Sequence, residues 1–556
     1  MRRLAALLLA AFVLALLPAS PASAHAALLD STPQDGVVLQ EAPREVVLRF
    51  NQPVGIGLGA VRVVGPGGER VDDGAPQQRT GDREVVVAVP RAGERGTYVL
   101  LWRVMSEDSH PVSGASVFSV GAPSEPAAAA EADAAGTSTA LRGFRLLGFL
   151  GVLVLVGTVA VTVLVWPAGL RLRRVHALLA GGVALACTGS AGTLLAQGPN
   201  AAGLPVSRAL ELLPEVVGTR YGTAHLARLL LLGVVAVLLV VLVRSGRPPG
   251  TRWRLALLAL GLPLAATWSL AGHPAAGSLA VLAVPVDALH LLAVGTWVGG
   301  LVVLAAVLLH RTDVDELRAA LTGWSRLAVA AVVVMAATGL FAGWREVRAL
   351  DALGGTTYGR LLLLKVVLVL GMLYAGNRGR FLVQRYYGVG PTVVHASTAT
   401  AVAEPAPAAP PERARRALRR GTGVEVALAA AVVLVTTLLV DTPPAASDYA
   451  RPLSTVTRVD DSLTVQLDLD SARVGPNTLH VYLTGPGGRA FDVPEVTGRI
   501  TRDGESVPVQ IERISLGHYE ATERLVVPYR GTWELEVTVR TSDIDASTVR
   551  QTLSIR

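Results

Sequence analysis

Eight long apolar runs dominate the middle of the chain. They cover about residues 143–166, 175–196, 224–243, 253–271, 281–309, 326–344, 360–377 and 423–440. Each run is close to the ~20 residues that a helix needs to cross the hydrocarbon core of a bilayer. The pattern therefore predicts an eight-helix transmembrane bundle over residues 141–442.

Short strand-like segments flank this region on both sides. Before it, "REVVLRF", "REVVVAV" and "GTYVLLWRVMS" are rich in β-branched residues, and after it "SLTVQLDLD", "NTLHVYLTG" and "VPVQIERIS" follow. Such runs between glycine-rich turns are typical of small β-sandwiches. We expect an all-β sandwich over residues 25–121, a low-complexity linker over 122–140 and a second all-β sandwich over 447–556.

Residues 1–24 have the layout of a secretory signal peptide. Two arginines follow Met1, an apolar core covers residues 4–17, and Ala-Ser-Ala ends at Ala24. This core is short for a membrane span, so we expect cleavage, with an uncleaved anchor as the alternative. The mature chain would then begin at His25, which would carry a free α-amine and an imidazole on one residue.

Arginine is distributed unevenly between the loops that join the apolar runs. The loops after the first, third, fifth and seventh runs are rich in it, for example at Arg171 and Arg244, whereas the alternate loops hold few. Loops rich in Lys and Arg stay in the cytoplasm. We therefore expect a multi-pass protein of the cell membrane with both β-domains on the extracytoplasmic side, which agrees with the signal peptide.

Composition supports this organisation and narrows the partners. The hydrophobic fraction of 51% and the mean hydropathy of +0.47 are high for a soluble protein. The net charge of +7 is spread between the apolar runs, so we expect membrane lipid and no nucleic acid as a partner. Because Cys187 is the single cysteine, no disulfide can form within the chain.

The first β-domain holds two histidines, His25 and His110. Asp108 precedes His110 by two residues, and side chains two apart on an extended segment point to the same face. Together with the amine and imidazole of His25, these side chains offer three nitrogens and one oxygen. This donor set suits a tetragonal ion, for which Cu(II) is the usual occupant.

Residues 25–120 resemble the CopC copper-binding domain. The resemblance lies in "HAALLDSTPQDG", "EAPREVVLRFNQPV" and "RVMSEDSHPVSGASVFSV". It implies that His25, Asp108 and His110 are the Cu(II) ligands. Since Met105 is the single methionine of this domain, it also implies a version without a methionine-rich Cu(I) site.

The rest of the chain resembles two further families. The membrane region resembles CopD in "GHPAAG" (Gly272–Gly277), "DALHLLAVGTWVGGL" (Asp287–Leu301) and "TTYGRLLLLKVVLVLGMLYAGNR" (Thr356–Arg378). The last domain resembles the YtkA-like exported module in "GPNTLHVYLTGPGGR" and "GHYEA". The whole chain therefore resembles a CopC–CopD fusion with a YtkA-like domain, which implies copper uptake or handling.

Polar residues in the predicted spans suggest a path for copper. Ionisable side chains inside a membrane are costly and are candidates for function. Asp287 and His290 are three residues apart and share a helix face, near the outer side of the fifth span. Lys365 is an alternative partner for Asp287 that would make the cluster structural. The candidates for the membrane path are His290, Asp287, His273, His225 and Trp297.

Three classes of function remain open. In the first, Cu(II) is captured outside and passed to the transmembrane domain for import, with other copper-handling proteins as partners. The second is an exported copper-sequestering or resistance protein with a membrane anchor or sensor. The third is a copper monooxygenase, which shares the N-terminal histidine chelate; Asp108 as a further ligand speaks against it, and we expect no enzyme. His480 and His518 are either a second metal site or structural histidines.

Overall fold

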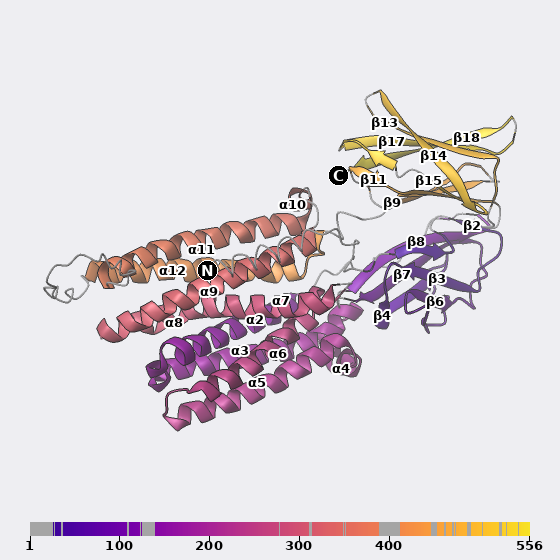
Figure 1. The fold of residues 1–556 in the computed structure, drawn as a ribbon. Coiled ribbons are helices and arrows are strands. Elements are labelled where there is room, and N and C mark those ends of the chain that lie inside the picture. The colour runs from indigo at the N-terminus through magenta and orange to yellow at the C-terminus, as the bar shows by residue number, and fades with distance from the viewer. Residues whose placement is uncertain are drawn as a thin grey trace.

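Two β-domains lie at the same end of a long helical bundle (Figure 1). The computed structural model describes residues 26, 28–34, 37–107, 111–122, 124, 139–276, 279–310, 314–347, 350, 352–387, 412–445, 453–460, 463–469, 472, 474–485, 491–502, 504–521, 525–529, 531–542 and 544–555. The expected class, an N-terminal all-β sandwich, an eight-helix bundle and a C-terminal all-β domain, is confirmed, and the last domain, expected as a second sandwich, forms one eight-stranded sheet.

Eight helices of the described chain are long and apolar enough to cross a membrane, as predicted. They are formed by α2 (Thr139–Ala160) with η1 (Val161–Val165), α3 (Arg173–Ala202), α5 (Arg220–Ser245), α6 (Thr251–Leu270), α7 (Ala280–Val294) with η5 (Gly295–Gly299), α8 (Gly300–Ala306) and η6 (Leu308–His310), α9 (Val314–Val347), α11 (Thr357–Tyr387) and α12 (Glu412–Val440). Shorter helices connect them: η2 (Pro167–Arg171), η3 (Val206–Arg208), α4 (Ala209–Val217), η4 (His273–Ala275) and α10 (Ala352–Gly355).

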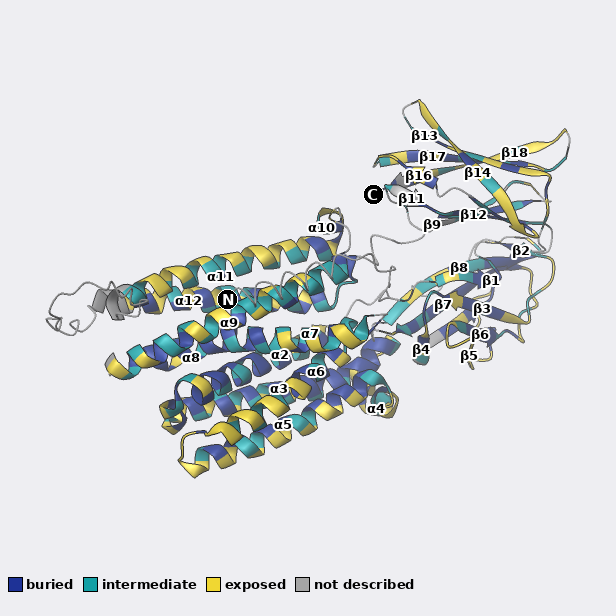
Figure 2. Ribbon diagram, in the orientation of Figure 1, coloured by how far each residue is buried: buried dark blue, intermediate teal, exposed yellow. Residues whose placement is uncertain are grey.

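Many residues along the outside of the bundle are exposed (Figure 2), and large apolar side chains are numerous among them. Val237 and Leu340 are each 63% exposed, and Val281 is 92% exposed. Large apolar side chains in such numbers are unfavourable against water and stable against hydrocarbon. The exposure pattern therefore agrees with the membrane location that the apolar runs predict.

Glycine allows the first and fifth spans to approach closely. A Cβ added to Gly157 would lie 2.2 Å from the backbone of Gly299, and one added to Gly299 would lie 1.9 Å from the Leu153 carbonyl oxygen. Both distances are shorter than real contacts, so larger residues would force α2 and η5 apart. The spacing of Gly295 and Gly299 in the sequence is typical of such helix contacts.

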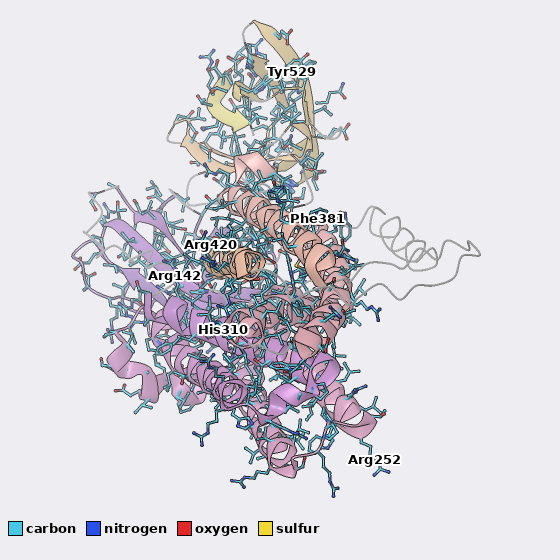
Figure 3. All side chains as sticks on the ribbon, turned by 90° about the vertical axis from the view of Figure 1, so that its left-hand side faces the viewer. Arg142, Arg252, His310, Phe381, Arg420 and Tyr529 are labelled. Atoms are coloured by element: carbon cyan, nitrogen blue, oxygen red, sulfur yellow. The ribbon has the colours of Figure 1, made fainter. Side chains whose placement is uncertain are left out.

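The first and last spans are joined by ion pairs at the end that carries the β-domains. Arg142 Nε donates to Asp441 Oδ2 at 3.1 Å, and Arg145 pairs with the same carboxylate. Figure 3 looks along the bundle from the opposite end, where the side chain of Arg252 extends outward. The pairs hold the start of α2 against the residue that follows α12.

The N-terminal β-domain consists of two four-stranded sheets, in the orders β1-β3-β6-β5 and β2-β8-β7-β4. Its strands are β1 (Leu28–Thr32), β2 (Val38–Leu39), β3 (Glu45–Phe50), β4 (Val54–Val64), β5 (Gln77–Arg79), β6 (Glu84–Ala88), β7 (Gly96–Ser106) and β8 (Pro111–Val120). Alternate residues of β3 point inward. The ring of Phe50 packs edge to face against Trp102 of the other sheet, with 5.4 Å between the ring centroids. The predicted sandwich is therefore present.

The C-terminal β-domain is one eight-stranded sheet with a separate two-stranded β11-β16 ribbon. Its strands are β9 (Leu453–Arg458), β10 (Thr464–Leu469), β11 (Gly475–Asn477), β12 (Leu479–Thr484), β13 (Glu495–Arg502), β14 (Glu505–Ser515), β15 (His518–Ala521), β16 (Leu525–Val527), β17 (Gly531–Arg540) and β18 (Ala546–Ile555). The long strand β14 pairs with β13 along its first half and with β15 along its second half. The two halves of β14 therefore contribute to one apolar core, which includes Trp533.

Candidate metal centre

The three predicted Cu(II) ligands, His25, Asp108 and His110, lie outside the described residues. Their neighbours in the chain are described. The Ala26 N–H donates to Ser106 Oγ at 2.9 Å, and Gln52 Nε2 donates to the same oxygen at 2.7 Å. Ala26 and Ser106 are each 5% exposed, so this contact is part of the domain core.

This contact joins the two ligand-bearing segments. Ala26 directly follows His25, and Ser106 ends β7 two residues before Asp108. The last register pair of β7 and β8 is Met105 with Pro111, so residues 107–110 connect two paired strands. The hydrogen bond from Ala26 to Ser106 therefore holds two segments, 80 residues apart in sequence, together at one end of the sandwich.

That end of the sandwich rests on the helical bundle. Met105 packs against an apolar cluster of Leu194, Ala201, Val216 and Tyr221, which α3, α4 and α5 supply. Arg103 Nη2 donates to the Asn200 carbonyl at 2.6 Å, and burial lowers the pKa of Arg103 from its usual value. The β-domain is thus fixed to the bundle by both apolar and polar contacts.

Arg220, at the start of α5, bridges the β-domain and the segment between α6 and α7. Its guanidinium donates to the Glu107 carbonyl and, through Nη1, to the Ala275 carbonyl at 2.8 Å. Arg345 binds the same segment from the other side, at the His273 and Ala276 carbonyls (3.0 and 2.6 Å). The loop that contains His273 is therefore one arginine side chain away from the residue that precedes Asp108.

Asp287 and His290 lie in α7 between α6 and α9. Asp287 Oδ2 accepts a hydrogen bond from Ser269 Oγ at 2.7 Å, and Lys365 attracts the carboxylate electrostatically. His290 Nδ1 lies 2.9 Å from Thr338 Oγ1 of α9. The structure thus gives both residues polar partners from neighbouring helices, as buried polar groups in a membrane require.

His225 belongs to a separate polar cluster. Its Nδ1 lies 2.9 Å from the Tyr221 carbonyl oxygen, and one turn later Arg228 donates to Thr267 of α6 and covers the Trp268 ring at 3.7 Å. Thr267 and Ser269 are two residues apart, about 200° around the helix axis. Helix α6 therefore lies between the His225 cluster and the Asp287 cluster.

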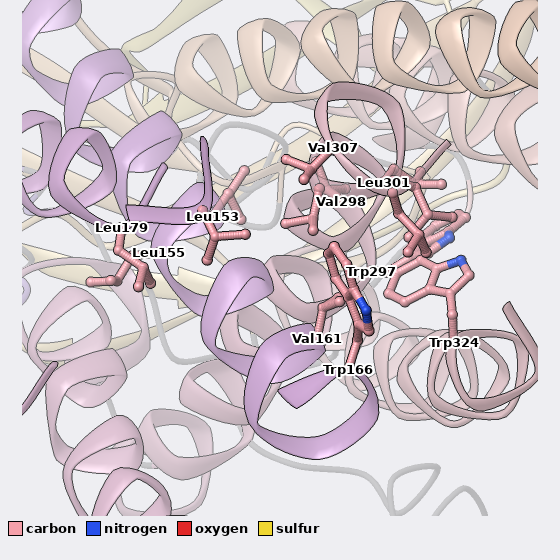
Figure 4. Close-up of a cluster of buried hydrophobic side chains, with 14 of the residues drawn as sticks. Leu153, Leu155, Val161, Trp166, Leu179, Trp297, Val298, Leu301, Val307 and Trp324 are labelled. Carbon is pink, nitrogen blue, oxygen red and sulfur yellow. The ribbon is translucent and has the colours of Figure 1, made fainter. Parts of the chain in front are cut away.

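Trp297 lies in the main apolar cluster of the bundle, near Val161 and Trp324 (Figure 4). It is 5% exposed, and the π-helical segment η5 that carries it packs against α2. The contacts of its ring are those of a packing residue. Asp287 and His290 share α7 but have partners on different helices, α6 and α9. His273 lies in the loop that Arg220 joins to the β-domain, and His225 and Trp297 lie elsewhere.

Two buried charged residues escaped the sequence analysis. Arg228 is 4% exposed and Glu425 is 5% exposed, both inside apolar runs. Glu425 lies against glycines of α11, since a Cβ on Gly376 would come within 3.1 Å of its Oε2. A charged residue within an apolar run is the sequence signal that identifies both residues. In the described chain, no three His, Cys, Asp or Glu side chains are arranged as a metal site.

Comparison with known families accounts for most of the chain. A CopC domain matches residues 28–121, a copper resistance protein D-like N-terminal domain matches residues 136–281, and copper resistance protein D matches residues 318–439. The chain carries CopC and CopD domains in one polypeptide. It is therefore a membrane protein of copper transport or copper resistance, whereas the YtkA-like character of its last domain stays a prediction.

Individual proteins are similar to all or to part of this chain. The copper transport protein CutJ of Bacillus subtilis is 24% identical over 545 residues, 94% of each chain. Protein YobA of Escherichia coli is 29% identical over 98 residues, 17% of this chain and 79% of YobA. Among solved structures, CopC from Methylosinus trichosporium OB3b is 31% identical and covers 18% of this chain and 99% of its own, with a TM-score of 0.17. The methionine-rich copper resistance protein PcoC from Escherichia coli is 24% identical and covers 17% of this chain and 99% of its own, with a TM-score of 0.16.

Proposed function

We propose that this chain captures Cu(II) outside the membrane and passes it to the transmembrane helices for import. His25 would supply its α-amine and imidazole, and Asp108 and His110 would complete the site. The hydrogen bond from Ala26 to Ser106 is the observation that supports this proposal most directly. It holds the residue after His25 next to the end of the strand that leads to Asp108.

The transfer route would begin at Arg220. This residue joins the Glu107 carbonyl to the Ala275 carbonyl, so an ion released from Asp108 and His110 would meet the loop that carries His273. From there, Asp287 and His290 offer one carboxylate and one imidazole within the bundle. Carboxylate and imidazole are both ligands for divalent copper.

Copper uptake tests this function. Cells producing the full chain should accumulate more cytosolic copper than cells lacking it. The triple variant His25→Ala, Asp108→Ala, His110→Ala should lose most of this gain at low external copper, because it removes the capture site. Metal content of the cytosolic fraction is measured by mass spectrometry, with membrane protein level as the control. Copper bound outside without any cytosolic gain would instead support sequestration.

Topology is a separate prediction. Both β-domains lie at one end of the bundle, and arginines such as Arg252 extend from the other end (Figures 1 and 3). Since loops rich in arginine remain in the cytoplasm, we propose that both β-domains are extracytoplasmic. Reporter fusions at Pro407 and at Arg556 should therefore report opposite sides of the membrane. Two reporters on the same side would contradict the proposed orientation.

A further inference from the structure

Two histidines far apart in sequence meet on the outer face of the C-terminal β-domain. His480 of β12 and His518 of β15 point away from the core, because the alternate residues Val481 and Tyr519 are buried. His480 Nδ1 lies 3.1 Å from His518 Nε2. Neither strand shows this relation in its own sequence, since strand pairing creates it.

Carboxylates surround this pair. Glu520 is directly opposite His480 in the β12–β15 register, and its Oε2 lies 3.8 Å from His480 Nδ1. Asp468 is opposite His480 on the other side, in β10, where Gln466 Nε2 donates to both of its oxygens at 3.0 Å. The ring of Tyr482 stacks on His518 with 4.4 Å between centroids, which fixes the orientation of that imidazole.

The distance between the two ring nitrogens suits a shared metal ion. Imidazole nitrogens bind transition metals at about 2.0 Å, so nitrogens 3.1 Å apart subtend an angle of about 100° at such an ion. This angle lies between the values for adjacent square-planar and tetrahedral ligands.

We propose that His480 and His518 form a second copper site, separate from the N-terminal chelate. Imidazole suits copper, and Cu(II) is bound more tightly than the other divalent ions of its row. Because only two histidines contribute, with Glu520 as a nearby oxygen donor, the remaining positions on the ion stay open to water or to a donor from another chain. Such a site holds copper more weakly than the four-donor chelate and exchanges it more readily.

The position of the pair gives this second site a source of copper. Asp30 of strand β1 is close enough to interact electrostatically with Asp468 and Tyr482 of the C-terminal domain. The sheet that carries the histidines therefore faces the domain that would capture copper, and His25 lies five residues before Asp30. The second site rests on the proposed function only for the source of its copper. Binding at His480 and His518 does not depend on transport.

The same distance also fits a plain hydrogen bond between one protonated and one unprotonated ring nitrogen. A titration separates the two interpretations. The purified full chain in detergent, carrying His25→Ala, Asp108→Ala, His110→Ala and His290→Ala so that neither the N-terminal chelate nor the proposed membrane path holds copper, is titrated with Cu(II) chloride, and bound copper is measured after gel filtration. One copper per chain should remain. Adding His480→Gln and His518→Gln should abolish it, whereas adding His176→Gln, a histidine of the membrane domain, should leave it unchanged.

A spectroscopic measurement covers the case in which the substitutions impair folding. Pulsed electron paramagnetic resonance on the chelate-free chain, with His480 and His518 intact, should detect two imidazoles on the bound Cu(II). Absence of bound copper, or a signal without coordinated imidazole, would overturn the second site. Neither result would touch the uptake proposal, because the N-terminal chelate and transport play no part in this measurement.

Discussion

A chain extended by one residue before His25 is expected to bind Cu(II) at least about 100-fold more weakly, because even the loss of an outer partner of a metal ligand costs 10–100-fold in affinity. The extension turns the free α-amine into an amide and so removes one nitrogen from the chelate. It leaves the His25 imidazole, Asp108 and His110 in place. Competition titration against a chelator of known affinity gives the change, and the electron paramagnetic resonance spectrum should report one nitrogen fewer.

The variant Ser106→Ala provides the matched control for this experiment. It removes the oxygen that accepts from Ala26 and Gln52, and therefore loosens the segment after His25 without removing a copper ligand. Losing these two buried hydrogen bonds should cost about 1–3 kcal/mol of folding stability. We expect a smaller loss of Cu(II) affinity and an unchanged spectrum. If the extended chain keeps both its affinity and its spectrum, the amine is not a ligand.

Much of the architecture could be predicted because it follows from local sequence patterns. Each span needs about 20 apolar residues in a row, and that requirement is visible without any partner segment. Strand β12 shows the alternation just as plainly, with Leu479, Val481 and Leu483 buried and the residues between them outside. A pattern of period two indicates a strand with one buried face wherever it occurs.

Contacts between distant segments could not be predicted in this way. Arg220 appeared only as one of the few arginines in an alternate loop, yet it joins Glu107 to Ala275. His480 and His518 looked like two isolated histidines, yet the pairing of β12 with β15 brings them together. Which strand pairs with which, and in which register, depends on the whole hydrophobic core and not on either segment alone.

The position of Asp287 and His290 could be predicted in part. The three-residue spacing of Asp287 and His290 correctly places them on one face of α7, but it does not tell which helices face them. The structure supplies Ser269 from α6 and Thr338 from α9. These partners also show why His225, on the far side of α6, is not a neighbour of Asp287.

The variant His290→Ala is expected to abolish copper accumulation, down to the level of cells without the protein. We expect this because the His290 imidazole and the Asp287 carboxylate both lie on α7, the helix that follows the loop carrying His273. Cytosolic copper is measured together with the amount of folded protein in the membrane. Cu(II) binding by the outer domain should be unchanged, since His290 lies in α7 of the bundle, where its partner is Thr338 of α9.

The variant Thr338→Val tests whether His290 is needed as a ligand or only as a hydrogen-bond partner. Thr338 Oγ1 lies 2.9 Å from His290 Nδ1, and valine replaces that hydroxyl with a methyl group of similar shape. If the histidine is structural, both variants lose the same hydrogen bond, and both should lower the amount of folded protein. If the histidine handles copper, Thr338→Val should retain much of the uptake, whereas His290→Ala should retain none. A well-expressed His290→Ala chain with normal uptake would remove this residue from the copper path.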